Sequence, residues 1–164
     1  MSQLSFASEY RVQKRRVEAT LTLTTGQSVR GHFFLGETSM SGEGPERVDD
    51  LLNSAHGFFP FERLDDGPPR IVLYNASHVG LVRLGGDQAC EVPGYEVATV
   101  RHVALLLSTG AQVAGSVRVY LPPGSDRVSD WAREPGVFRY LETSGGTWLV
   151  NIHHVAEIVE RESK

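Results

Sequence analysis

Side chains that could perform catalysis are present, but they do not gather into a catalytic spacing. The chain has six histidines and one cysteine, and no group of them has the spacing of a metal site. The neighbours His153 and His154 would point to opposite faces of a strand. No serine sits in a nucleophile elbow, and no Gly-x-x-x-x-Gly-Lys phosphate loop occurs. We therefore expect a protein that is not an enzyme and holds neither a metal nor a cofactor.

One arrangement of residues could bind a nucleotide. Arg11 and Arg15 fit the pattern Arg-x-x-x-Arg, and Asn75, Ser77 and Gly80 fit Asn-x-Ser-x-x-Gly. Together these two motifs resemble the cyclic-di-GMP signature of PilZ proteins, in which arginines clamp guanine and phosphate groups with paired hydrogen bonds. The resemblance implies a ligand-sensing regulator with these five residues at its site. We keep this reading as an alternative function.

Two Arg–Asp pairs have a spacing that favours a structural role. Arg47 with Asp50, and Arg127 with Asp130, are three residues apart in segments that we expect to be short helices. Such a pair can form a local ion pair, or the aspartate can accept a hydrogen bond from a backbone amide. A pair that faces a ligand is the alternative. We assign all four residues a structural role.

The elements that must position these side chains are short strands. Residues 17–24 alternate strictly between apolar and polar types, which is typical of a half-buried strand. Gly26 can form the tight turn that follows, and Gly31 lies inside the next strand, where glycine indicates a bend or a close backbone approach. The remaining elements of the first half are a short helix and three strands, expected over 45–53, 58–62, 70–74 and 79–84.

The same pattern is present twice. Residues 109–115 repeat the hairpin of 25–31, so that Gly110 and Gly115 correspond to Gly26 and Gly31. The offset between the copies falls in steps that lie in the loops, from 84 (Gly110 with Gly26) to 80 (Phe138 with Phe58) and 76 (Asn151 with Asn75). Matches within strands and length changes only between them indicate an internal duplication.

Each copy has the element order of a small barrel. Five short antiparallel strands usually close, because an open sheet of that size leaves long edges. The strand order, the early glycine in the second strand and the stretches 74–79 and 150–155 resemble Sm-like (SH3-type) barrels. The Arg-Val-x-Asp helix is similar to one in a group of bacterial tandem-barrel proteins of unassigned function. We therefore expect an all-β protein with short helices, built as two tandem five-stranded SH3/Sm-like barrels over 10–84 and 95–163, with a linker over 85–94.

The composition limits the kinds of partner that this chain is expected to bind. A formal charge of −4 in 164 residues disfavours binding to a phosphate backbone. RNA-binding members of the Sm-like family carry an Arg-Gly pair before the fifth strand, where this chain has Asn75-Ala76 and Asn151-Ile152.

No apolar run has the length of a membrane span, and no signal peptide is visible. The lone Cys90 is compatible with a reducing compartment, so we expect a cytoplasmic protein.

The aromatic residues indicate a protein partner. The chain has more phenylalanine, tyrosine and tryptophan than two small cores need, and an excess of this kind can form an interface. We predict a non-catalytic protein-interaction, scaffold or regulatory module that binds a protein or associates with itself. Trp131 and Phe59 are the predicted contact residues. The alternatives are the PilZ-type regulator and an Sm-like nucleic-acid binder.

Overall fold

The computed structural model describes residues 14–39, 44–55, 57–85 and 94–162, and within them it is built almost entirely of antiparallel strands. The first half contains, in order, β1 (Arg15–Leu23), β2 (Ser28–Leu35), α2 (Val48–Ser54), β3 (Phe58–Arg63), β4 (Arg70–Asn75), the single 3-10 turn η1 (Ala76–His78) and β5 (Val79–Leu84). The second half contains η2 (Tyr95–Val97), β6 (Thr99–Leu107), β7 (Gln112–Val119), α3 (Val128–Ala132), β8 (Phe138–Thr143), β9 (Gly146–Asn151), η3 (Ile152–His154) and β10 (Val155–Arg161). The predicted linker over 85–94 lies mostly outside the described residues.

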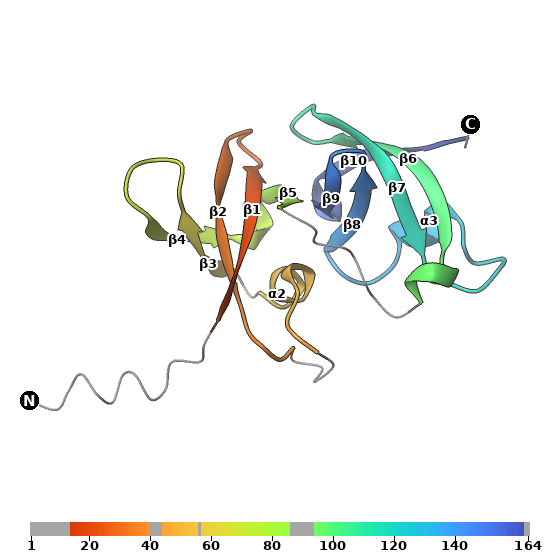
Figure 1. Ribbon diagram of the computed structural model, residues 1–164. Helices are drawn as coiled ribbons and strands as arrows, with labels where there is room; N and C mark the ends of the chain where they lie inside the picture. Colours follow the sequence, from red (N-terminus) through yellow and green to blue (C-terminus); the bar gives the residue numbers. More distant parts are fainter. Residues whose placement is uncertain (1–13, 40–43, 56, 86–93, 163–164) are drawn as a thin grey trace, which may run out of the picture.

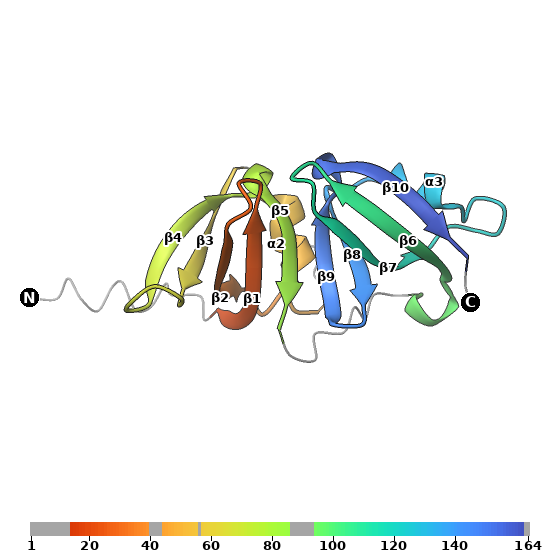
Figure 2. The same ribbon diagram turned by 90° about the horizontal axis from the view of Figure 1, so that it is seen from above.

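All ten strands belong to one open sheet. Their order is β10-β6-β7-β8-β9-β5-β1-β2-β3-β4, with antiparallel neighbours throughout (Figures 1 and 2). The prediction of two closed SH3/Sm-like barrels is therefore wrong. The reason lies where the halves meet: β5 of the first half pairs with β9 of the second, so each satisfies the backbone groups of the other. β4 and β10 are left at the two ends of the sheet.

Two apolar clusters form the core, and each draws residues from both halves. The first is centred on Phe33, which stacks on Phe59 with ring centroids 5.6 Å apart and meets Phe61 edge-on at 5.1 Å. The second surrounds Leu105 and Leu141. The first cluster also contains Phe138 and Leu149 from the second half, and the second contains Leu81 from the first half. Packing between the halves is thus continuous with packing inside them.

The glycines of the repeated hairpin meet two different backbone needs. Gly26 and Gly110 have φ values of +92° and +90°, which other residues rarely adopt, and they turn the chain between strands. A Cβ atom on Gly31 would lie 1.9 Å from the carbonyl oxygen of Glu62 in β3. A Cβ atom on Gly115 would lie 2.4 Å from the carbonyl oxygen of Glu142 in β8. The second strand of each half can pair with the third only because these positions lack a side chain.

The two Arg–Asp pairs lie at the starts of the two helices. The Oδ2 atom of Asp50 accepts the backbone N–H of Arg47 at 3.0 Å, and Asp130 accepts that of Arg127 at 3.1 Å. Each aspartate therefore caps its helix. The Arg127 guanidinium also approaches Asp130, with Nε 3.4 Å from Oδ2. These contacts are local, and they stabilise the first turn of α2 and of α3.

Candidate protein-interaction surface

The junction between β5 and β9, which we call the seam, shows how this fold joins two sheet edges. Leu81 faces Val150 across the seam, and Val82 faces Leu149. Because side chains alternate along a strand, the first pair points into the second apolar cluster and the second pair into the first cluster. Arg83 at the end of the seam lies over the ring of Trp148, 4.8 Å from its centroid. The seam is therefore buried on both faces of the sheet.

Helix α2 holds the second half in place through polar contacts. The side chain of Asn53 accepts the backbone N–H groups of Val137 and Phe138, at 3.0 and 2.7 Å, and donates to the carbonyl of Phe138 at 3.2 Å. The hydroxyl of Tyr140 donates to Asp49 at 2.6 Å. These contacts fix the start of β8 against the helix, so the outer face of β8 and β9 is covered.

In the first half, the equivalent face is open to solvent. Applying the offsets of the repeat, Phe58 of β3 corresponds to Phe138, and Leu73 of β4 corresponds to Leu149. Phe58 and Leu73 are 65% and 63% exposed, whereas Phe138 and Leu149 are 4% and 0% exposed. Ile71, on the same face, is 56% exposed. We call Phe58, Ile71 and Leu73 the outer apolar face.

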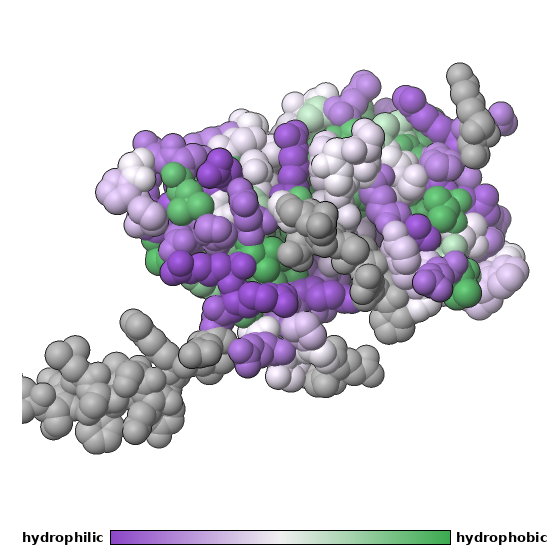
Figure 3. Space-filling view, in the orientation of Figure 1, coloured by the Kyte–Doolittle hydropathy of each residue, from purple (hydrophilic) through white to green (hydrophobic). Residues whose placement is uncertain are grey.

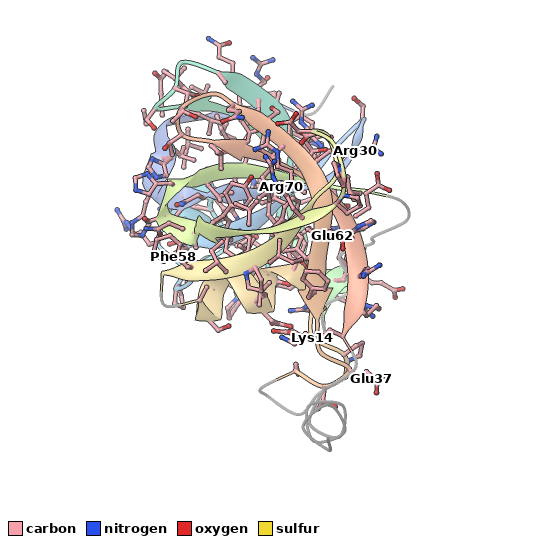
Figure 4. All side chains as sticks on the ribbon, turned by 90° about the vertical axis from the view of Figure 1, so that its left-hand side faces the viewer. Lys14, Arg30, Glu37, Phe58, Glu62 and Arg70 are labelled. Carbon is pink, nitrogen blue, oxygen red and sulfur yellow. The ribbon has the colours of Figure 1, made fainter. Side chains whose placement is uncertain are left out.

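The outer apolar face lies at one end of the molecule. Figure 3 shows hydrophobic surface at the left-hand end, where Figure 1 places β3 and β4. Figure 4 looks onto this end and shows Phe58 and Arg70 toward opposite ends of the strand pair. β4 is the last strand of the sheet, so within the described residues its outer edge pairs with no strand. An exposed edge beside apolar side chains is the usual setting for strand addition.

Charged residues surround the turn between β3 and β4. The guanidinium of Arg63 donates to Asp65 at 2.9 Å, and Asp66 lies 3.6 Å from Arg70. The backbone N–H of Arg30 donates to Asp65 at 3.1 Å. This N–H and, to a smaller extent, the Arg63 guanidinium lower the pKa of Asp65 below its ordinary value. At the turn between β3 and β4, the outer apolar face is therefore bordered by charged side chains that pair with one another.

The two predicted contact residues lie in the core. Trp131 is 3% exposed and packs in the second cluster, and Phe59 is buried in the first. Neither side chain is available to a partner in this fold. The exposed aromatic residue is Phe58, one position earlier on the same strand. Alternation predicts that one of the two neighbours points inward and one outward, but the sequence gives no sign of which.

The residues of the PilZ-type motif do not come together in the described part of the chain. Arg15 starts β1, where its guanidinium donates to the carbonyl of Glu46 at 3.0 Å. Asn75 caps η1 by accepting the backbone N–H and the hydroxyl of Ser77. The N–H of Thr24, just past the other end of β1, donates to the carbonyl of His78. The nine residues of β1 separate Arg15 from η1 by about 26 Å.

Of the two remaining residues of this motif, one lies in the core and the other lies outside the described residues. Gly80 is buried in β5. Arg11 lies outside the described residues. A nucleotide that contacts Asn75 and Ser77 would therefore lie far from Arg15, and the two halves of the motif do not form one site within the described residues.

Other candidate sites are also limited by the structure. Among the described residues, no group of three or more histidine, cysteine, aspartate or glutamate side chains could hold a metal ion. No helix in the same residues is long and apolar enough to cross a membrane. Cys90 lies outside them.

No protein-family model, no curated protein and no solved structure matches this chain. The resemblances drawn from short motifs stay predictions.

Proposed function

We propose that this protein is a non-catalytic interaction module that binds a second copy of itself by pairing open sheet edges. One observation carries the proposal. The face that the second half buries at the seam is exposed in the first half, at the equivalent residues Phe58 and Leu73. The chain thus presents, at β4, the same kind of edge that β9 uses inside the molecule. At β10 it presents the counterpart of β5.

The repeat offset gives the register of the proposed contact. In the seam, Val82 faces Leu149. Adding the offset to the first residue gives 82 + 76 = 158, and subtracting it from the second gives 149 − 76 = 73. Ile158 of one copy would therefore face Leu73 of the next, with Val159 beside Val72. β10 of one molecule extends the sheet of its neighbour in the same antiparallel sense as β5 and β9.

The apolar residues on both edges support this pairing. Val159 on β10 is nearly half exposed, and Ile158 is half-buried against the second cluster. Removing a side chain the size of Phe58 or Leu73 from water contributes about 1.5–3 kcal/mol. Association of two molecules costs about 4–15 kcal/mol, and strand hydrogen bonds supply only part of the difference. We therefore expect weak association that depends on concentration.

The contact joins two different surfaces, which determines what it builds. A dimer formed by β4 and β10 still carries one open β4 and one open β10, so further copies can add until the chain of molecules closes. Such a head-to-tail contact makes a ring or a filament. This is the property of a scaffold, and it requires no ligand and no catalytic group.

Sedimentation velocity tests the proposal. The unmodified protein, followed from about 2 to about 200 µM, should gain average mass with concentration over this range of weak affinity. Leu73→Asp blocks the β4 edge, and Val159→Asp blocks the β10 edge. Each variant alone should stay monomeric. An equimolar mixture of the two should form a dimer that does not grow, because each partner keeps only one open edge.

The control is another exposed apolar residue. Val97 in η2 belongs to neither edge strand and is more exposed than Phe58, so Val97→Asp should associate as the unmodified protein does. A monomer throughout the concentration range would contradict the proposal. Association that persists unchanged in Leu73→Asp would place the contact elsewhere.

A further inference from the structure

A cavity of about 350 Å³ is lined by residues of α2 and of the second half, and by none of the two edge strands β4 and β10. Its walls come from α2, η2, β7, β8 and the segment that follows α3. Aromatic side chains form much of the lining, and they are Tyr95, Tyr120, Trp131, Phe138 and Tyr140. The volume is at the lower end of the range for small-molecule sites, and such sites combine apolar walls with a few placed polar groups.

Most charged groups on the walls are already paired. The guanidinium of Arg118 donates to Glu142 at 3.0 Å and stacks on Tyr95, 3.6 Å from the ring centroid. The hydroxyl of Tyr95 donates to the other oxygen of Glu142. Asp49 accepts from Arg47 at 3.1 Å and from the hydroxyl of Tyr140. These groups hold the walls in place and leave no charge to be matched.

Glu134 is the exception. Its Oε1 atom is buried and has no hydrogen-bond partner among the described residues. The nearby guanidinium of Arg139 donates to the backbone carbonyls of Trp131, Glu134 and Gly136, and it lies over the ring of Trp131. Burial raises the pKa of the Glu134 carboxyl, and the charge of Arg139 opposes that rise. A buried acceptor without a donor is unfavourable, so a ligand that donates a hydrogen bond to this carboxylate is stabilised there.

We propose that the cavity binds a small organic cation, whose ammonium or guanidinium head donates an N–H to the carboxylate of Glu134. The aromatic walls accept an aliphatic stem. Arg139 does not compete for the carboxylate, because its donors are committed to carbonyl oxygens. The inference is independent of self-association, since the lining residues belong to neither β4 nor β10.

Tryptophan fluorescence can test the site. Trp131 lines the cavity, and Trp148→Phe makes it the only tryptophan in the chain. In this background, n-butylammonium and n-butylguanidinium should change the emission along a saturable curve. The neutral n-butanol and the anionic pentanoate have the same n-butyl stem, and both should bind at least about tenfold more weakly, as loss of a charge-assisted hydrogen bond implies. This comparison needs no variant at the site.

Glu134→Gln should weaken binding of both cations at least about tenfold, a factor that corresponds to one hydrogen bond with a charged group. Glu37→Gln, an exposed glutamate in the first half, should leave binding unchanged. Urea unfolding of both variants checks that they are folded. Nα-acetyl-lysine methylamide tests whether the bound cation is a side chain of a protein or a free amine. Binding tighter than that of n-butylammonium indicates a protein side chain, and weaker binding indicates a free amine. Equal binding of n-butanol and n-butylammonium, tighter binding of pentanoate, or no saturation by either cation would overturn the proposal.

Discussion

The outer faces of β3–β4 and β8–β9 have the same backbone arrangement and opposite environments. Both strand pairs are antiparallel hairpins in which residue 58 or 138 opposes an asparagine, Asn75 or Asn151. The second face is covered by α2 and β5, and the first is covered by nothing in the described residues. The comparison teaches that the position of a strand in the sheet, and not its own sequence, decides whether this face is core or surface.

The two helices differ in the same way. α2 lies at the seam, where Asn53 and Asp49 contact β8. α3 occupies the equivalent position in the second half, and the residues that correspond to Asn53 and Asp49 are Arg133 and Ser129. Arg133 is exposed, and no second β8 lies against it. The helix that faces another half carries residues that bond to it, and the helix that faces solvent does not.

The largest effect on stability is expected at Gly31 and Gly115, the equivalent positions at which both halves require glycine. Gly31→Ala places a Cβ atom 1.9 Å from a backbone oxygen of β3, which must move, so the free energy of unfolding should fall by about 3 kcal/mol or more. Gly115→Ala meets its neighbour at 2.4 Å and should cost less. Urea unfolding measures both. Gly80→Ala, whose nearest neighbour is 3.7 Å away, is the control, and equal stability of all three variants would refute the close-approach explanation.

A matched pair of leucines tests the contrast between the faces directly. Leu149→Ala removes a fully buried side chain at the seam and should lower the free energy of unfolding by about 2–5 kcal/mol. Leu73→Ala is the equivalent change on the exposed face and should alter it by about 0.5 kcal/mol or less in dilute, monomeric protein. Chemical denaturation at low protein concentration measures both. Similar losses in the two variants would show that the face of β4 is covered in solution.

The smallest of these effects is expected at the helices. Asn53→Ala removes the acceptor of the backbone N–H groups of Val137 and Phe138, which should cost about 0.5–1.5 kcal/mol because Asn53 is exposed and water can take its place in part. Arg133→Ala removes the exposed counterpart and should leave stability almost unchanged. Thermal unfolding of the two variants gives the difference. A loss at Arg133 as large as that at Asn53 would show that α3 also meets a partner.

Local structure followed closely from the sequence. The strand expected over 79–84 is β5 with the same bounds, and the helix expected over 45–53 is α2, slightly later in the chain. The glycines at 26 and 110 turn the chain, as the hairpin pattern predicts. These predictions succeed because alternation, turn residues and helix caps act over a few neighbouring residues.

The errors concern contacts between distant residues. The five-strand pattern of each half predicts a barrel, but the pattern does not say which edge meets which. The choice between Phe58 and Phe59, and the burial of Trp131, depend on what covers each strand and helix. No short motif carries this information. The cavity beside Glu134 is also invisible in the sequence, because α2 and β7, which both line it, belong to different halves.

The duplicated order of strands, the turns at glycine and the capped helices follow from the sequence alone, since each depends on local backbone preference. The joining of the two halves into one open sheet depends on tertiary contacts. That outcome rests on Leu81 meeting Val150, two residues that are far apart in the chain and that have no local preference for each other. Because the edges of β5 and β9 satisfy each other, β4 and β10 are left open at the ends, together with an apolar face that nothing in the described residues covers.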